Sequence, residues 1–246
     1  MAYYVFGIIR GNGGENWPHA ELNGKSYRVL PIETNQMAAV VADVNETSFD
    51  PSRKNARTHQ KITSEAHTRE TFLPMSFGTV LQEKKDVKKL LTTLRPQAEK
   101  MFPKLENRME VGLRLTADET YLRELASRSP VLKNIKAKQQ KKGQLHFGER
   151  LEAGEASAAF MKELHENIQQ SFFKPLSKIA DSVKSNDLMH EKMVMNASFL
   201  VHEENEEAFD EEVNRLHDEW KEKLSFTYTG PWPPFNFVDI QMKAGR

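Results

Sequence analysis

Residues Met109–Leu115, MEVGLRL, run directly into the tetrapeptide Thr116–Glu119, TADE. The first stretch predicts a β-strand. Thr and Glu at this spacing are typical of a capping box, in which two side chains satisfy free backbone N–H groups at a helix start. A helix is therefore expected directly after the strand, and its apolar side chains would be Tyr121, Leu122 and Leu125. This strand-to-helix junction marks the start of a second structural unit.

The chain after this junction alternates between helical and strand patterns. Ser129-Pro130 should stop or redirect the first helix, because proline cannot continue a helical hydrogen-bond ladder. Apolar residues at steps of three and four over Met161–Val183 predict a long helix bent at Pro175. The remaining expected elements are a strand, a helix and two strand-like segments: Met193–Val201, Phe209–Leu224, Ser225–Thr229 and Phe235–Ile240. This order is close to the split βαβ arrangement of ferredoxin-like domains, with a helical insertion over about residues 129–184.

The residues before the junction predict a separate β-rich unit. Runs of β-branched and aromatic residues predict strands at Tyr3–Ile9, Tyr27–Ile32, Met37–Val44 and Ser76–Leu81. A solvated helix is expected over residues 50–72, and a second helix from Val87 to Leu105 that Pro96 and Pro103 should break or kink. The predicted fold class is α+β with two domains. The first is an α+β sheet domain, residues 1–106, and the second a modified ferredoxin-like domain with inserted helices, residues 107–246.

Composition excludes several classes of function. A chain of 246 residues suits two modest domains. Its 35 basic and 35 acidic residues cancel, so no net field attracts nucleic acid or an anionic membrane. The absence of cysteine excludes disulfides and thiolate chemistry and is compatible with the cytoplasm. No run of about 18 apolar residues is present to span a membrane. We expect a cytoplasmic protein that binds neither nucleic acid nor membrane.

No segment carries the residues of a familiar active site. Gly11, Gly13 and Gly14 follow a strand, but Trp17-Pro18 and the next strand argue against the helix start that a phosphate loop needs. The pairs His165-Glu166, His190-Glu191 and His202-Glu203 each lack the second histidine of a zinc-protease motif. We therefore expect no enzyme activity, no cofactor and no metal.

Two stretches are unusual enough to indicate a family. The first is Leu73-Pro74-Met75-Ser76-Phe77-Gly78-Thr79-Val80, and the second is Thr229-Gly230-Pro231-Trp232-Pro233-Pro234-Phe235-Asn236-Phe237-Val238. Together with the opening Tyr3–Ile8 and the strand Met109–Arg114, they resemble the gas vesicle protein F/L family in order and position, so the resemblance covers nearly the whole chain. Ser76 departs from the Arg common in that family, so no role of that Arg is carried over. His59 lies where members often have a His, without an assigned catalytic role. We expect the motif residues of both stretches to be structural, with three prolines restricting the backbone and the aromatic rings supplying apolar area.

The resemblance implies an accessory role rather than catalysis. It implies association with the hydrophobic gas vesicle shell protein A and with other gas vesicle accessory proteins while the vesicle is nucleated. A binder that masks an apolar subunit would limit its aggregation. Two alternatives remain: a nucleotide-responsive regulator or enzyme, motivated by the glycine loop, and an RNA-binding module. The residues do not distinguish the F form from the L form.

The partner surface is predicted on the helical insertion. Phe172 and Phe173 are adjacent, so one of their rings must point away from the main apolar stripe of the helix. Phe173 is the candidate contact, and its alternative is packing against the first domain. A basic run ahead of it could recognise acidic groups, or could be an ordinary solvated face, and its candidate contacts are Lys138, Lys141 and Lys142.

Overall fold

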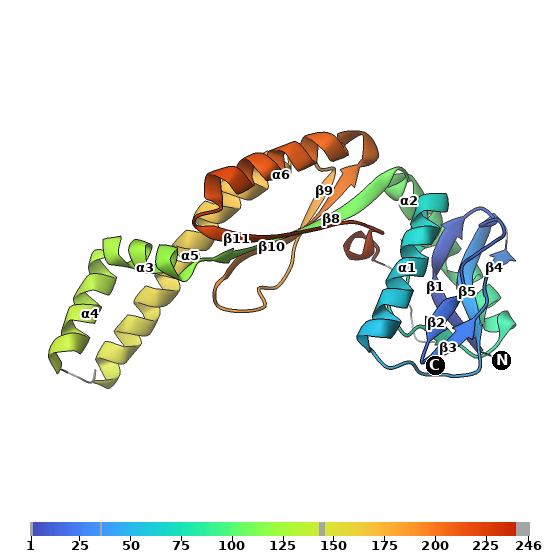
Figure 1. Cartoon of the computed structure of the whole chain (residues 1–246), viewed down its shortest axis with the longest axis horizontal. Helices are drawn as coiled ribbons and strands as arrows, with labels where there is room; N and C mark the ends of the chain where they lie inside the picture. Colours follow the sequence, from blue (N-terminus) through green and yellow to red (C-terminus); the bar gives the residue numbers. More distant parts are fainter. Residues whose placement is uncertain (1, 35, 143–145, 240–246) are drawn as a thin grey trace. The chain divides into compact units, whose positions relative to one another are not determined.

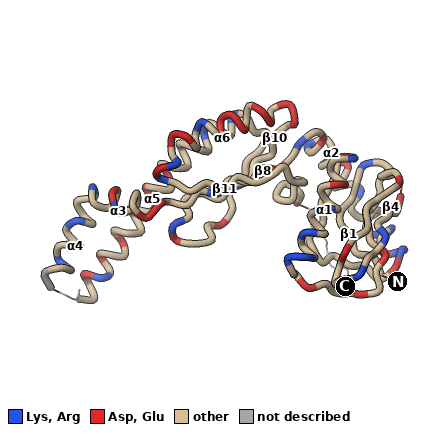
Figure 2. Tube along the Cα trace, in the orientation of Figure 1, with Lys and Arg blue, Asp and Glu red and all other residues tan. Residues whose placement is uncertain are grey.

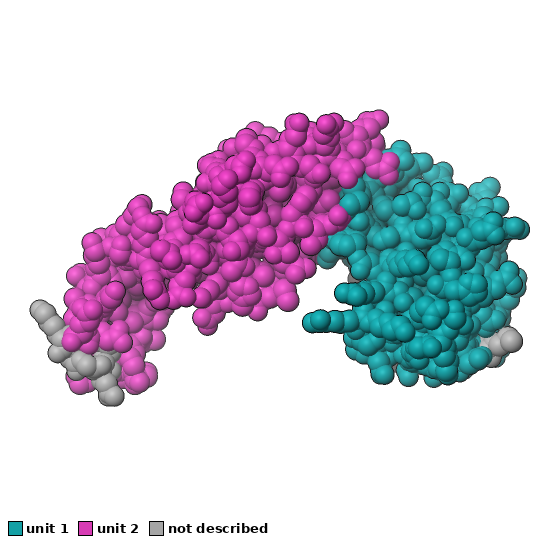
Figure 3. Space-filling view, in the orientation of Figure 1, with its two compact units in different colours: residues 1–110, 231–246 teal, residues 111–230 magenta. Residues whose placement is uncertain are grey.

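The computed structural model describes residues 2–34, 36–142 and 146–239, with the backbone alone at 141 and 142. It contains both helices and strands, in two compact units (Figures 1 and 3). Unit 1 comprises residues 1–110 and 231–246, and unit 2 comprises residues 111–230. The boundary predicted at residues 106–107 lies close to the first division. The C-terminal residues, however, group with unit 1 and not with the unit that precedes them.

Unit 1 is organised around a five-stranded sheet. Its main path runs β4 (Val29–Thr34), β5 (Met37–Val44), β1 (Ala2–Arg10) and β6 (Phe72–Pro74), and β7 (Val80–Leu81) also pairs with β1. A small hairpin, β2 (Ala20–Leu22) and β3 (Lys25–Tyr27), forms a second sheet. Strand β5 is buried continuously from Met37 to Ala42, so both faces of the main sheet are covered.

Two helices cover this sheet, and both pack against β1. Helix α1 (Arg53–Arg69) begins at Ser52, whose Oγ accepts a hydrogen bond from the Asn55 N–H at 3.2 Å. Helix α2 (Lys84–Leu105) continues through Pro96 and Pro103, so neither proline breaks it, and a kink at either position stays a prediction. Both prolines lie on the exposed side, while every third or fourth residue of the opposite face is buried. Burial of that apolar face offsets the missing backbone donors.

The segment between α1 and α2 differs from the prediction. The strand expected over Ser76–Leu81 is confined to β7, because Gly78 adopts a φ of 83° and turns the chain. Strand β7 pairs with β1 at Tyr3 and Tyr4, and β6 adds a further pairing, in which Leu73 lies opposite Ile8 and Pro74 opposite Gly7.

Unit 2 contains a four-stranded sheet, and strand β8 and the last strand each continue into unit 1. The sheet order is β11 (Leu224–Trp232), β8 (Arg108–Ala117), β10 (Met193–His202) and β9 (Ser182–Ser185). Between β8 and β9 lie three helices: α3 (Glu119–Arg128), α4 (Pro130–Lys142) and α5 (Phe147–Leu176). A short 3-10 turn, η1 (Glu203–Asn205), leads into α6 (Glu206–Trp220), which precedes β11. The core lies between the sheet and the apolar faces of α5 and α6, and includes Ile168, Phe172, Phe199 and Phe209.

Three predicted details of this unit are wrong. Helix α3 is capped by Asp118, whose Oδ1 accepts from the Thr120 N–H at 2.7 Å, and not by Thr116. Helix α5 ends at Leu176, and Val183 belongs to β9, which pairs with Phe199 of β10. A short polar strand such as SVKS carries too weak a pattern to be recognised by itself. The segment expected as a strand over Phe235–Ile240 forms a 3-10 turn, η2 (Phe235–Phe237), and Ile240 lies outside the described residues.

Charge is distributed unevenly along unit 2. Lysines are spread along α4, which has no acidic residue, whereas Asp and Glu predominate along α6 (Figure 2). The neutral total of the whole chain therefore conceals local fields of both signs.

Candidate functional site

The first unusual segment is fastened to β1. After β6, the Met75 N–H donates to the Phe6 carbonyl at 2.9 Å, and the Val5 N–H donates to the Thr79 carbonyl at 2.8 Å. A Cβ at Gly7 would lie 2.2 Å from the Phe72 ring, so this strand crossing requires glycine. The segment from residue 73 to residue 80 therefore forms part of the sheet edge and its turn.

The second unusual segment is held by one buried carboxylate. Glu110 is 5% exposed, and it accepts hydrogen bonds from the backbone N–H of Asn236 at 2.8 Å and from its Nδ2 at 2.5 Å. Pro233 and Pro234 are buried, Trp232 is half-buried and Phe235 is 38% exposed. The carboxylate thus fixes the turn η2, and the prolines carry more of the burial than the aromatic rings do.

His59 on α1 lies where these two segments meet. Its ring centroid is 5.7 Å from that of Phe77 in the first segment and 6.1 Å from that of Phe235 in the second. Tyr4 Oη lies 2.9 Å from His59 Nδ1 and accepts from the Gly78 N–H at 3.0 Å. We name Tyr4, His59, Phe77 and Phe235 the aromatic junction.

The aromatic junction is electrically neutral near pH 7. Burial lowers the pKa of His59 to about 4, and the Met75 backbone opposes this only in part. Burial also raises the pKa of Tyr4 to about 12. Among the described residues, no hydrogen bond of normal geometry reaches the buried His59 Nε2. A neutral histidine beside a phenol that stays protonated resembles a packing element more than an acid–base pair, because no carboxylate among the described residues orients the ring.

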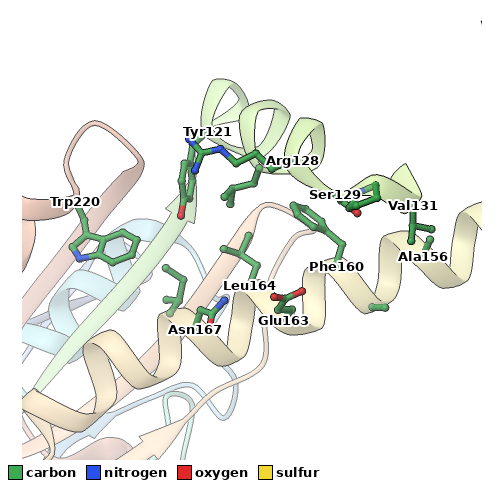
Figure 4. Close-up of a pocket in the computed structure, with 14 residues that line it drawn as sticks. Tyr121, Arg128, Ser129, Val131, Ala156, Phe160, Glu163, Leu164, Asn167 and Trp220 are labelled. Carbon is green, nitrogen blue, oxygen red and sulfur yellow. The ribbon is translucent and has the colours of Figure 1, made fainter. Parts of the chain in front are cut away.

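Unit 2 contains a groove of about 520 Å³ between α3 and α5. Figure 4 shows Tyr121 on the α3 side, Phe160 and Leu164 on α5, and Trp220 at one end. No residue of α3 is fully buried, so this helix does not close onto α5. Two charged groups line the groove on opposite walls, Arg128 on α3 and Glu163 on α5 (Figure 4).

The predicted partner contacts fall in different surroundings. Phe173 is half-buried, and its ring centroid lies 5.8 Å from that of Phe199 in the core of unit 2. Lys138 lies 3.5 Å from the Glu152 carboxylate. Lys141 and Lys142 lie on α4, and their side chains are outside the described residues. The large apolar side chains that are exposed on the insertion are Val131 at 51%, Phe147 at 76% and Leu151 at 56%.

Sequence reasoning did not find the Glu110–Asn236 tie, the groove, or the exposed positions Phe147 and Leu151. The tie and the groove depend on contacts between residues far apart in the chain, which a local pattern does not reveal. Phe147 and Leu151 were detectable in principle, because two large apolar residues four apart on a polar stretch form one helical face.

The glycine loop after β1 lacks the geometry of a phosphate site. Gly13 and Gly14 have φ values of 73° and 61°, and the next element is strand β2, not a helix. A nearby hollow is lined by Glu33 and Glu70, whose carboxylates would repel a phosphate. In the described part of the chain, no cluster of three or more His, Asp or Glu residues could hold a metal. Across those same residues, no helix is long and apolar enough to cross a membrane.

These features define a class of protein with mixed helices and strands. Its buried polar groups hold distant chain segments together, and its groove in unit 2 lies between helices and is lined mainly by apolar side chains. The chain belongs to the gas vesicle synthesis protein GvpL/GvpF family, whose model matches residues 2–239.

Individual relatives agree over most of the length. The chain is 26% identical to gas vesicle protein F1 of Halobacterium salinarum over 246 residues, covering 98% of this chain and 94% of that protein. It is 30% identical to gas vesicle protein F of Nostoc sp. over 204 residues, covering 81% and 83%. The crystal structure of gas vesicle protein GvpF from Anabaena sp. PCC7120 superposes with a TM-score of 0.82 at 25% identity, covering 100% of this chain and 99% of that one. These matches bear out the family indicated by the two unusual segments.

Proposed function

We propose that this protein is a non-enzymatic assembly factor that works in the cytoplasm. It would bind the hydrophobic gas vesicle shell protein A and other accessory proteins during vesicle nucleation, and limit shell-protein aggregation. The observation that carries the proposal is the family match across residues 2–239, and the relatives named F support an F-type role.

The helical insertion supports a binding role. Phe147 and Leu151 leave large apolar area exposed on one face of α5, and such area commonly marks an association surface. We therefore place the shell-protein contact on the α4–α5 hairpin, with the lysines at 138, 141 and 142 as its basic border. Phe173 is a weaker candidate than Phe147, since its ring already packs on Phe199.

We propose further that unit 2 is a modified ferredoxin-like domain. The support is its element order, β8, helices, β9, β10, α6, β11, and its sheet order, which places β8 and β10 in the middle. Helix α4 and the start of α5, which carries Phe147 and Leu151, would then belong to the helical insertion. We also propose that the two unusual segments are structural, because their contacts are with β1, with Glu110 and within the aromatic junction.

Co-expression with the shell protein tests the assembly role. We expect wild type to raise the soluble fraction of shell protein and to co-purify with it, and the double substitution Phe147→Ser/Leu151→Ser to reduce both. The matched control is Leu188→Ser/Met189→Ser, at residues 42% and 70% exposed in the β9–β10 loop. No gain in shell solubility with wild type would overturn the assembly role, and equal loss in both variants would overturn the placement.

The basic border requires a separate variant. Lys138→Glu/Lys141→Glu/Lys142→Glu should weaken co-purification in a salt-sensitive manner, because exposed charge contacts are screened. Phe173→Ser should weaken co-purification only together with stability, as Phe173 packs against the core of unit 2. Normal co-purification with the triple variant would remove the lysines from the contact.

The nucleotide-responsive alternative has weaker support. Its motivation was the glycine loop, which here leads into a strand beside two carboxylates. Saturable nucleotide binding measured by calorimetry, and abolished by substitutions at Gly13 and Gly14, would restore it.

A further inference from the structure

The groove of unit 2 has the shape of a space that one more helix could occupy. Both walls are helices, α3 and α5, and the groove follows α5 from Ala156 to Ile168. At about 1.5 Å per residue this is roughly 18 Å, the length of three to four helical turns. Its lining combines aromatic and aliphatic side chains with only a few polar groups, as in sites that bury an apolar ligand.

The backbone N–H and C=O groups of a bound peptide determine which secondary structure it can adopt in this groove. The groove offers no strand edge, so an extended peptide would bury backbone N–H and C=O groups without partners. A helix satisfies these groups internally and can present one apolar stripe to the floor. The occupant that fits the walls is therefore an amphipathic helix.

The charges on the walls specify the flanks of that helix. Arg128 lines the α3 wall, and its ion pair is with Glu124 of the same helix. Glu163 lines the α5 wall, and the neighbouring Lys162 pairs with Glu166 at 3.9 Å and not with Glu163. A helix seated between them would gain most with a carboxylate beside Arg128 and an amine beside Glu163.

We propose that this groove binds an amphipathic α-helix of a protein partner, with an apolar stripe of three to four turns, an acidic flank facing Arg128 and a basic flank facing Glu163. The site is distinct from the exposed residues Phe147 and Leu151. It rests on the proposed function only in supposing a protein partner, and it does not require that partner to be the shell protein.

A groove-filling substitution tests the site without disturbing the core. Ala159 lines the groove and is solvent-exposed, so Ala159→Trp should fill the space at little cost in stability. Ala158 is its neighbour on α5, is also exposed and does not line the groove, which makes Ala158→Trp the matched control. Melting curves of both variants should match the wild type.

The probe is a synthetic 18-residue peptide of Leu and Ala, with Glu along one side of the apolar stripe and Lys along the other. We expect saturable binding by fluorescence anisotropy to the full chain, unchanged by Ala158→Trp and weakened at least tenfold by Ala159→Trp. Arg128→Glu and Glu163→Lys should each weaken binding several-fold, and a peptide with Ser in place of Leu should not bind. Absence of binding to wild type, or equal binding to both tryptophan variants, would overturn the site. Because this assay uses a peptide and not the shell protein, a negative peptide result would not overturn the assembly role. A negative co-expression result would likewise not overturn the groove as a helix-binding site.

Discussion

Acidification should destabilise unit 1 through His59. The perturbation is a change from pH 7.5 to pH 4.5, and its target is the buried, neutral ring in the aromatic junction. The folded pKa of His59 is about 4, compared with 6.5 in an unfolded chain. Below pH 6.5 the histidine of the unfolded chain therefore binds a proton, whereas His59 of the folded protein stays unprotonated. Stability from this group is complete above pH 6.5 and falls as the pH drops toward 4.

The size of the loss follows from those two pKa values. Each pH unit between them costs about 1.4 kcal/mol, and the folded state itself begins to protonate near pH 4.5. The His59 contribution to the free energy of unfolding should therefore fall by about 2–3 kcal/mol between pH 7.5 and pH 4.5. Tyr4, the titratable group in contact with His59, stays neutral throughout, because its pKa is about 12.

The assay is urea unfolding followed by tryptophan fluorescence in a Trp220→Phe background. The remaining tryptophans, Trp17 and Trp232, then report unit 1. Other groups also titrate over this range, so wild type is compared with His59→Gln, which keeps a polar side chain of similar size but cannot titrate. Wild type should lose about 2–3 kcal/mol more than the variant. If the two proteins lose the same free energy, His59 is not held neutral by burial, and the interpretation of the junction fails.

Three further substitutions test the ties around this junction. Gly7→Ala places a methyl group 2.2 Å from the Phe72 ring and should cost about 1–3 kcal/mol, seen as a lower melting temperature; an unchanged melt would show that β6 moves freely. Glu110→Gln removes a charged acceptor from Asn236 and should cost about 1–3 kcal/mol, with faster amide exchange at residues 235–237; unchanged exchange there would contradict the tie. Trp232→Ala should lower the melting temperature by less than a fully buried ring would, whereas an unchanged melt with lost partner binding would make this residue an exposed contact.

The local sequence pattern was sufficient to predict an element when the residues of that element alone indicated its structure. Strand β5 occupies residues 37–44 as predicted, because eight consecutive residues of high apolar content sit between turn residues. The apolar stripe through Ile62 and Ala66 also placed α1 correctly, and both residues are fully buried. In each case burial and local propensity favour the same structure.

Prediction from the sequence was wrong where tertiary contacts outweigh the local conformational preference of the residues. Proline at positions 96 and 103 opposes a helix locally, yet burial of Leu91, Leu94 and Phe102 keeps α2 intact. The junction itself joins strand β1, helix α1, the turn at Gly78 and the C-terminal turn. These four elements are far apart in the sequence. The two family segments could therefore be recognised from the sequence, but their contact with each other could not be predicted.

Unit 1 draws on chain segments that precede and follow unit 2, and this has a consequence during synthesis. A ribosome makes Tyr4 and His59 early, but Phe235 and Asn236 only after all of unit 2. Until then the histidine and the Glu110 carboxylate lack partners that the finished fold gives them. Unit 2 lies wholly between the two segments of unit 1, so it emerges from the ribosome before the closing segment of unit 1 does. A chain cut short anywhere before Phe235 would leave His59 without its contact to Phe235, and the Glu110 carboxylate without its hydrogen bonds from Asn236.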